Sequence, residues 1–236
     1  MNSILEDLRA DLFRNSNEKD RLAGLRFFKE EVNLLGMKAA VVTTIAKEYY
    51  RNIPDKSKSN IFYLCDELFA SGIMEESFVA CNWSYNVHKA YELTEFGIFE
   101  KWVNNYINNW ATCDTICNHT VGTLVEMYPE LLIGLKRWAR SENRWVKRAS
   151  AVSLIVPARK SLFLEDIFEI AEILLHDTDD MVQKGYGWML KVASQKHQKE
   201  VFDFVLQRKA EMPRTALRYA IEKMPEEMKR EAMKKP

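Results

Sequence analysis

Two side chains near the middle of the chain, Trp110 and Asp114, have types and a spacing that could bind a cationic ring. They are four residues apart, so on an α-helix they share one face, one turn from each other. The indole offers its negative face to a cation, and the carboxylate adds a full negative charge. Aromatic residues on helices more often pack into a core. This stretch alone therefore favours a buried tryptophan beside a capping or solvated aspartate.

Residues 141–150 form a second stretch that combines cationic and aromatic side chains. Arg144 and Arg148 are one helical turn apart, and Trp145 and Arg148 are three residues apart. Close helix packing with solvated charges at its edge is the ordinary explanation of such a pattern, and binding of a polyanion is the functional one.

In a third stretch, Lys184, Trp188 and Lys191 share a helical face. Gly185 and Gly187 lie among them, although a glycine costs about 1 kcal/mol relative to alanine inside a helix. Two glycines in three residues therefore predict the close approach of a neighbouring helix or of a ligand backbone.

The composition is typical of a helical protein with a sizeable core. Of the 236 residues, 47% are hydrophobic and 29% are charged, and only eight are glycine and six proline. No apolar run approaches the roughly 18 residues of a membrane span. The first seven residues lack the order of a signal peptide. We therefore expect one cytoplasmic domain over residues 1–236 that does not associate with membranes.

The four cysteines predict neither a disulfide scaffold nor a metal site. Four are too few for a scaffold of this size. Cys113 and Cys117, one helical turn apart, lack the Cys-x-x-Cys spacing and the two further ligands of a zinc site. We expect buried thiols, no metal and no cofactor. A thiol-dependent enzyme has little support, because Asp114 beside Cys113 would disfavour a thiolate.

The formal net charge is zero but unevenly distributed. Residues 1–135 carry a net charge of −6, residues 136–223 carry +5, and the last thirteen residues add +1. The basic part is where a polyanion would bind. An excess this modest permits nucleic-acid binding without requiring it.

Nearly every segment has apolar residues at the 3.6-residue period of an α-helix, and no run shows convincing strand alternation. We expect a helix from Trp110 to about Met127, and an earlier one whose stripe runs from Leu22 to Val32 before a stop at Gly36. Candidate N-caps and helix-starting prolines punctuate the chain at Asn143, Asp179, Pro129, Pro213 and Pro225. Further helices are expected at residues 4–12, 38–50, 57–70, 74–91, 96–107, 129–141, 144–155, 163–176, 180–196, 200–209 and 213–224.

The landmarks recur at a nearly constant interval. Trp110 and Arg148 are 38 residues apart, and Arg148 and Trp188 are 40 apart. These steps lie near the roughly 40–47 residues of a HEAT-type helical pair. Stacked pairs would bring equivalent faces onto one concave surface. The same helices could also form an irregular bundle.

Taken together, these stretches resemble the DNA alkylation repair family of HEAT-like glycosylases, in its AlkD-like branch. Phe27, followed by the Leu-Leu-Gly of residues 34–36, also fits the N-terminal pattern of that family. The match spans essentially the whole chain in order. Its motifs are Asn-Trp-x3-Asp (109–114), Ser-Glu-Asn-Arg-Trp-x2-Arg-Ala (141–149), Val-Pro-Ala-Arg-Lys (156–160), Val-Gln-Lys-x2-Gly-Trp-x-Leu (182–190) and Pro-Arg-Thr-Ala-Leu-Arg-Tyr-Ala-Ile-Glu-Lys (213–223).

The resemblance implies a right-handed α-solenoid of HEAT-like antiparallel helix pairs whose concave face binds duplex DNA. It implies a monofunctional glycosylase that hydrolyses the N-glycosidic bond of N3- and N7-alkylated purines, without a metal, a cofactor or a base-flipping pocket. By residue, it assigns the catalytic carboxylate to Asp114, the two cleft tryptophans to Trp110 and Trp188, and a phosphate-binding arginine to Arg148. We expect a monomer whose partner is duplex DNA containing alkylated purines.

Three positions depart from the pattern of the family. Ala111 stands where an acidic residue is common, and Lys191 stands where arginine is common. Phe27 stands where the N-terminal aromatic that contributes to the cleft is often tyrosine. Lysine gives a point charge in place of a bidentate fork. We still expect Lys191 and Phe27 to contact DNA, together with Arg144 and Lys184.

The chemistry suits these residues because alkylation at N7 or N3 makes a purine cationic and a good leaving group. A strong general acid is then unnecessary, and one carboxylate at Asp114 could stabilise the oxocarbenium-like sugar and orient a water. Aromatic walls favour a cation by about 0.5–2 kcal/mol each.

The alternative is a non-catalytic HEAT-like scaffold that binds DNA or a protein. Steep weakening of binding with rising salt would indicate DNA, through counterion release. Arg214 and Arg218, on one expected helix, could face either DNA or solvent.

Overall fold

The structure is a computed structural model that describes residues 3–234. These residues form α-helices α1 to α16 and three shorter helical segments, as the all-α prediction requires. Within the described residues the only β pairing is one isolated bridge, between Asn33 and Ile73. The chain divides into two compact units, Met1–Ile116 and Cys117–Pro236, which we call the N-terminal and C-terminal units. The single domain over residues 1–236 stays a prediction.

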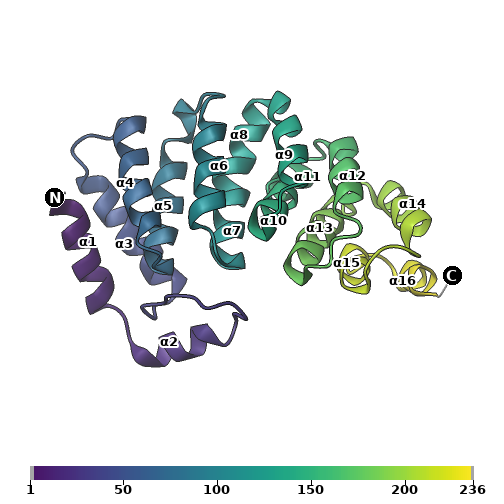
Figure 1. Cartoon of the computed structure of the whole chain (residues 1–236), viewed down its shortest axis with the longest axis horizontal. Coiled ribbons are helices and arrows are strands. Elements are labelled where there is room, and N and C mark those ends of the chain that lie inside the picture. Colours follow the sequence, from purple (N-terminus) through teal and green to yellow (C-terminus); the bar gives the residue numbers. More distant parts are fainter. Residues whose placement is uncertain (1–2, 235–236) are drawn as a thin grey trace. The chain divides into compact units, whose positions relative to one another are not determined.

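Seven α-helices build the N-terminal unit (Figure 1). Within it, α3 packs against α5, α5 packs against α7, and α4 packs against both α5 and α6. Successive odd-numbered helices therefore lie side by side in one layer. The helices are α1 (Ser3–Arg14), α2 (Glu18–Leu25), α3 (Ala39–Asn52), α4 (Lys58–Ala70), α5 (Met74–Asn86), α6 (Glu95–Tyr106) and α7 (Trp110–Ile116), with a 3₁₀ turn at His88–Ala90.

Aromatic side chains dominate the core of this unit. The ring of Phe62 meets that of Trp102 edge to face, with centroids 5.3 Å apart, and that of Phe99 at 5.7 Å. Such pairs add about 0.5–1.5 kcal/mol each beyond the area that they bury. The indole Nε1 of Trp102 donates to Oδ1 of Asp66 at 2.9 Å. The second buried tryptophan of this unit, Trp83, donates its Nε1 to the carbonyl oxygen of Ala46 at 2.8 Å, so both indole N–H groups have acceptors.

The second expected helix is shorter than its apolar stripe. Helix α2 ends at Leu25, and residues 26–38 run to α3 without regular structure. Near the end of the expected helix, the backbone amides of Leu35 and Gly36 bond instead to the carboxylate of Glu75 on α5. Gly36 has a φ of +96°, in the left-handed region that favours glycine. A contact 40 residues away therefore overrides the local helical pattern.

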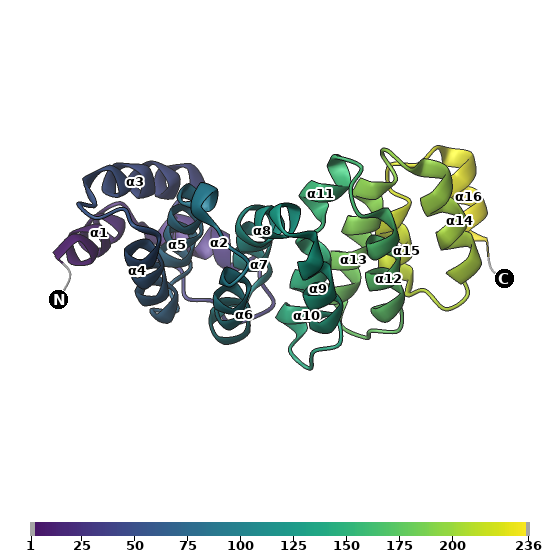
Figure 2. The ribbon, with the colours of Figure 1, turned by 90° about the horizontal axis from the view of Figure 1, so that it is seen from above.

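The C-terminal unit repeats the same layering (Figure 2). Helix α13 packs against α10 on one side and α15 on the other, while α12 packs against α9 and α13. Its helices are α8 (Gly122–Met127), α9 (Leu132–Trp138), α10 (Arg144–Val152), α11 (Ile155–Arg159), α12 (Leu164–Ile173), α13 (Asp180–Ala193), α14 (Gln198–Arg208), α15 (Arg214–Ala220) and α16 (Glu226–Met233), with a π-helix at Cys117–Val121 and a 3₁₀ turn at Pro129–Leu131.

The predicted helix from Trp110 to about Met127 is present, with one irregularity. Helix α7 continues through the π-helix into α8 without a break. A π segment is a local widening of an α-helix that often occurs at functional sites. Both candidate N-caps are also confirmed. Asn143 accepts from the amide of Trp145 at 2.9 Å, and Asp179 accepts from that of Met181 at 2.8 Å.

The two glycines of α13 are explained by helix packing. A Cβ at Gly187 would lie 2.7 Å from Cβ of Tyr219 and 2.8 Å from the carbonyl oxygen of Ala216 on α15. A Cβ at Gly185 would lie 3.2 Å from Cγ of Arg148 on α10. The first of the two predicted causes, a neighbouring helix, therefore accounts for both positions. Between residues 3 and 234, no helix has the length and apolar character needed to cross a membrane.

Candidate functional site

The side chain of Asn109 caps α7 and so sets the position of Trp110 and Asp114. Its Oδ1 accepts from the amide of Thr112 at 2.9 Å, and its carbonyl accepts from the amide of Cys113 at 3.2 Å. Thr112 and Cys113 are buried, whereas Trp110 and Asp114 are half-buried. The Asn-Trp pair thus begins a short helix whose aromatic and acidic side chains share the less buried face.

Trp110 is held in place by two consecutive phenylalanines of the loop at residues 26–38. The rings of Trp110 and Phe28 stack with centroids 5.4 Å apart and an interplanar angle of 23°. The indole Nε1 of Trp110 also donates to the carbonyl oxygen of Phe27 at 3.3 Å. Phe27 itself is 74% exposed. The carbonyl of Phe27 and the ring of Phe28 therefore fix the position of the Trp110 indole, one helical turn from Asp114.

Sequence reasoning missed Phe28. The N-terminal pattern points to Phe27, whereas Phe28 belongs to the apolar stripe from Leu22 to Val32 and is expected in the buried face of a helix. Helix α2 ends at Leu25, so that interpretation of Phe28 is wrong. The remaining signal in the sequence is that two aromatic residues occur together at residues 27 and 28.

In the C-terminal unit, Arg148 is almost fully enclosed. It is 5% exposed, and its Nη1 donates to the carbonyl oxygen of Met181 at 2.5 Å. Its Cγ lies in the space that a side chain at Gly185 would occupy. Buried guanidinium groups need such partners because desolvation of an unpaired charge is costly. Arg148 thus holds α10 against α13.

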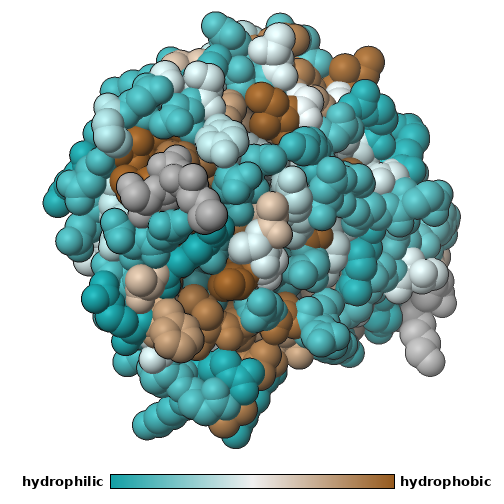
Figure 3. All heavy atoms as spheres, turned by 60° about the vertical axis from the view of Figure 1, so that its left-hand side comes forward, coloured by the Kyte–Doolittle hydropathy of each residue, from teal (hydrophilic) through white to brown (hydrophobic). Residues whose placement is uncertain are grey.

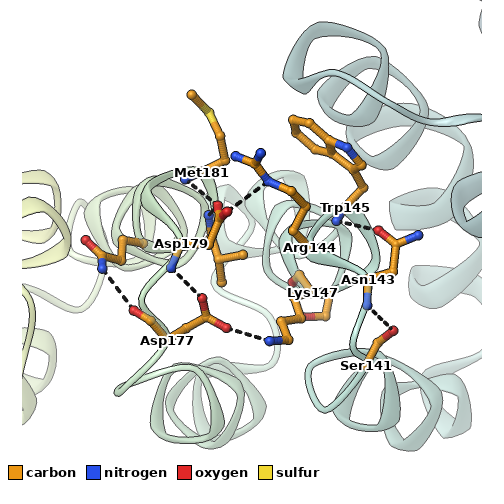
Figure 4. A network of polar contacts seen from close by, with 11 residues as sticks. Ser141, Asn143, Arg144, Trp145, Lys147, Asp177, Asp179 and Met181 are labelled. Atoms are coloured by element: carbon orange, nitrogen blue, oxygen red, sulfur yellow. Dashed lines mark hydrogen bonds and ion pairs between the residues drawn. The ribbon is translucent and has the colours of Figure 1, made fainter. Parts of the chain in front are cut away.

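Arg144 and Lys147 on α10 are paired with carboxylates just before α13 (Figure 4). Nε of Arg144 lies 2.9 Å from Oδ2 of Asp179, and its guanidinium lies over the ring of Trp145 at 4.8 Å. Nζ of Lys147 donates to Oδ2 of Asp177 at 2.8 Å. Both cations thus already have anionic partners within this unit.

Lys184 and Lys191 are paired as well. Nζ of Lys184 lies 2.7 Å from Oδ2 of Asp180, and Nζ of Lys191 lies 3.0 Å from Oε2 of Glu222. Lys191 also lies 5.3 Å from the ring centroid of Tyr219, and its side chain is only 16% exposed. The hydrogen bond from Lys191 lowers the pKa of Glu222. This carboxylate stays charged at neutral pH and competes with any phosphate for Lys191.

Three further residues have mixed surroundings. Trp188, on α13 with Lys184 and Lys191, is half-buried. Arg214 and Arg218 on α15 are both exposed, and Nη2 of Arg214 donates to the carbonyl oxygen of Met233 at 3.4 Å. Their exposure leaves both possibilities, DNA and solvent, open.

The thiols are not available for chemistry. All four cysteines are buried, as expected, and Cys113 and Cys117 have no exposed surface. Burial raises the pKa of the Cys65 thiol well above its usual value. Over residues 3–234, no three histidine, cysteine or acidic side chains gather into a group that could hold a metal ion.

The fold and these residues define an all-helical protein with a tryptophan–carboxylate pair on one helix and paired cations on others. The model of the family described as DNA alkylation repair enzyme matches residues 8–224, and the chain belongs to this family. Its fold is similar to that of a solved structure, a predicted DNA alkylation repair enzyme from Enterococcus faecalis. The TM-score is 0.78 at 14% identity, over 90% of this chain and 98% of that chain. No curated protein sequence matches this chain significantly.

Proposed function

We propose that this protein is a monofunctional DNA glycosylase that excises cationic N3- and N7-alkylated purines from duplex DNA by hydrolysis of the N-glycosidic bond. The observation that carries the proposal is the stacked pair of Trp110 and Phe28, with the half-buried Asp114 one turn from Trp110 on the same face of α7. This arrangement combines π faces with a carboxylate, which is what a cationic base and an electron-poor sugar require. Membership of the family supports a DNA substrate.

In this proposal, Asp114 stabilises the oxocarbenium-like sugar and orients the attacking water. The C–N bond breaks with its electrons leaving on the cationic purine, which becomes neutral. The water oxygen bonds to the anomeric carbon, and its proton passes to the Asp114 carboxylate and from there to solvent. An unmodified purine carries no charge and keeps a stronger glycosidic bond, so the aromatic wall favours the alkylated base. No metal or flipped-base pocket enters the scheme.

The C-terminal unit would supply the contacts with the DNA backbone. Trp188 on α13 contacts the lesioned nucleotide, and Arg144, Lys184 and Lys191 bind phosphates after exchanging their carboxylate partners for them. Arg148 is nearly enclosed, so its larger contribution is to hold α10 against α13. Such contacts set register without sequence preference.

We also propose that the helices stack as HEAT-like antiparallel pairs in a right-handed solenoid with a concave DNA-binding face. The packing inside each unit supports it. In the N-terminal unit α3, α5 and α7 follow one another side by side, and in the C-terminal unit α10, α13 and α15 do the same.

A non-catalytic scaffold that binds DNA or a protein is the second candidate. The pairing of Arg144, Lys184 and Lys191 with carboxylates favours it, because paired cations attract phosphates less strongly. The test is release of 7-methylguanine from methylated duplex DNA. Release above the spontaneous rate supports the glycosylase. Salt-sensitive DNA binding without any release would support a DNA-binding scaffold instead.

A further inference from the structure

The loop at residues 26–38, which carries Phe27 and Phe28, contains no helix, and its only β pairing within the described residues is the bridge at Asn33. Helix α2, which leads into it, buries none of its side chains. Three residues of the loop, Val32, Leu34 and Gly36, are buried, and Cδ1 of Leu34 lies against Gly24. The surface of this part of the molecule is rich in apolar side chains (Figure 3). A segment without helical or sheet hydrogen bonds relies on specific anchors to keep one conformation.

One anchor is the carboxylate of Glu75 in the first turn of α5. Glu75 is 2% exposed, and its Oε2 and Oε1 accept from the amides of Leu35 at 3.0 Å and Gly36 at 2.9 Å. Both oxygens thus bind consecutive amides, and hydrogen bonds to a charged acceptor are the stronger kind. The N-terminal end of α5 also favours a negative charge. These interactions offset the cost of burying the charge.

The loop is held next to Glu75 by two further backbone contacts. The amide of Met74 donates to the carbonyl of Asn33 at 2.9 Å, and the amide of Asn17 donates to the carbonyl of Gly36 at 3.0 Å. A Cβ at Gly36 would lie 2.3 Å from the carbonyl oxygen of Asn17. The backbone at Gly36 is therefore closely packed against Asn17, and Glu75 binds its amide.

We propose that Glu75 is a positioning residue that holds the loop of residues 26–38 and thereby sets Phe28 against Trp110. The path runs from the carboxylate to the amides of Leu35 and Gly36, and along the chain to the ring that stacks on the indole. The expected effect of Glu75 on excision rests on the proposed function. The expected effect of Glu75 on the surroundings of Trp110 is independent of that function.

The same helix provides a matched control. Glu76, the next residue, is equally enclosed at 2% exposed, but it accepts from Nε of Arg9 on α1 at 3.0 Å. Replacing either glutamate by glutamine removes one buried charge from the first turn of α5. Only Glu75→Gln places an amide N–H₂ group against backbone amides of the loop.

The test compares Trp110 emission and excision in Glu75→Gln and Glu76→Gln. Subtracting the spectrum of the same protein carrying Trp110→Phe isolates Trp110 from the other five tryptophans. We expect Glu75→Gln to shift this difference spectrum to the red and to lower kcat/KM for 7-methylguanine release about tenfold, the equivalent of one aromatic contact with a cation. Glu76→Gln should leave both unchanged.

An unchanged difference spectrum in Glu75→Gln, or the same shift in Glu76→Gln, would overturn the proposal. If Glu75→Gln does not fold, Glu75→Asp is measured in the same way, because it keeps the charge and shortens its reach by one methylene. An unshifted Trp110 spectrum in Glu75→Asp would equally overturn it. If the wild type releases no base, the proposed function fails while the spectra still decide the role of Glu75.

Discussion

The two units hold their candidate functional groups in different ways. In the N-terminal unit, Trp110 is held by backbone and aromatic contacts, through the carbonyl of Phe27 and the ring of Phe28. In the C-terminal unit, Lys184 and Lys191 are held by carboxylates. Backbone and ring contacts define a position without neutralising charge. Carboxylate partners hold a cation and weaken its attraction for phosphate at the same time. We infer that the N-terminal unit positions groups for catalysis, and that the C-terminal unit binds DNA with an affinity limited by its carboxylate partners.

The largest effect on stability that distinguishes the two units should come from replacing Arg148. Replacing it by alanine removes the guanidinium that bonds Met181 and opens a cavity beside Gly185. We expect the free energy of unfolding of the protein to fall by about 3 kcal/mol. Chemical denaturation measures it, with Arg140→Ala, an exposed arginine on the same unit, as the control. If Arg148→Ala loses DNA affinity but not stability, this expectation is contradicted, and the main role of Arg148 is to bind a phosphate.

Two glycine substitutions test the packing of α13, the helix that carries Lys184 and Lys191, against α15. Gly187→Ala should lower the free energy of unfolding by about 2 kcal/mol, because its Cβ would meet Tyr219 and Ala216. Gly97→Ala, in α6, meets nothing within 4 Å and should stabilise by about 0.5 kcal/mol. Thermal denaturation measures both variants. If Gly187→Ala is stabilised, or is destabilised no more than Gly97→Ala, the close packing of α13 on α15 is contradicted.

The aromatic surface of the N-terminal unit is tested by neighbouring phenylalanines. Phe28→Ala removes the ring that stacks on Trp110, so excision of 7-methylguanine should fall about tenfold. Phe27→Ala keeps the carbonyl that accepts from Trp110, so excision should change less than about threefold. Single-turnover kinetics distinguish the two variants. If Phe27→Ala lowers excision more than Phe28→Ala, the side chain of Phe27, and not that of Phe28, contributes to excision.

The smallest effect should come from releasing one paired cation. Glu222→Gln frees Lys191, so DNA affinity should rise about threefold, and the logarithm of affinity should fall more steeply with salt by about one unit of slope. Asp203→Asn, which frees Lys199 on α14, is the control. Fluorescence anisotropy over a salt series measures both. An unchanged affinity and slope in Glu222→Gln would show that Lys191 binds no phosphate.

The pair formed by Lys191 and Glu222 also gives a pH dependence of known sign. The pKa of Glu222 is lowered in the folded protein, so its contribution to stability is present above the unfolded pKa and is lost as pH falls through the folded pKa. The pair is partly exposed, so this contribution is below about 1 kcal/mol after solvent screening. The same protonation frees Lys191, so acidification and Glu222→Gln should act on DNA affinity in the same direction.

Much of the fold follows from local pattern. The helical period and the caps at Asn143 and Asp179 act within a few residues, so sequence predicts them. The two glycines of α13 predict a close approach, but not that Arg148 and Tyr219 make it. The loop after Leu25 was predicted wrongly as helix, because the carboxylate of Glu75 that holds it is distant in sequence.

The site divides in the same way. The shared face of Trp110 and Asp114 needs only helical geometry, and sequence predicts it. The choice between Phe27 and Phe28, and the pairing of Lys191 with Glu222 31 residues later, depend on how separate segments meet. Contacts between distant segments leave no periodic pattern in a single sequence, so they could not be predicted from it.

The most direct test of the central claim compares the wild type with Asp114→Asn on methylated duplex DNA, with Glu227→Gln, an exposed acidic residue on α16, as the control. We predict that 7-methylguanine release by Asp114→Asn falls at least a hundredfold, as expected when a preorganised charge at the reacting sugar is lost, while DNA affinity changes less than about threefold. Equal release by all three proteins, or a loss of DNA binding in Asp114→Asn as large as its loss of release, would contradict it.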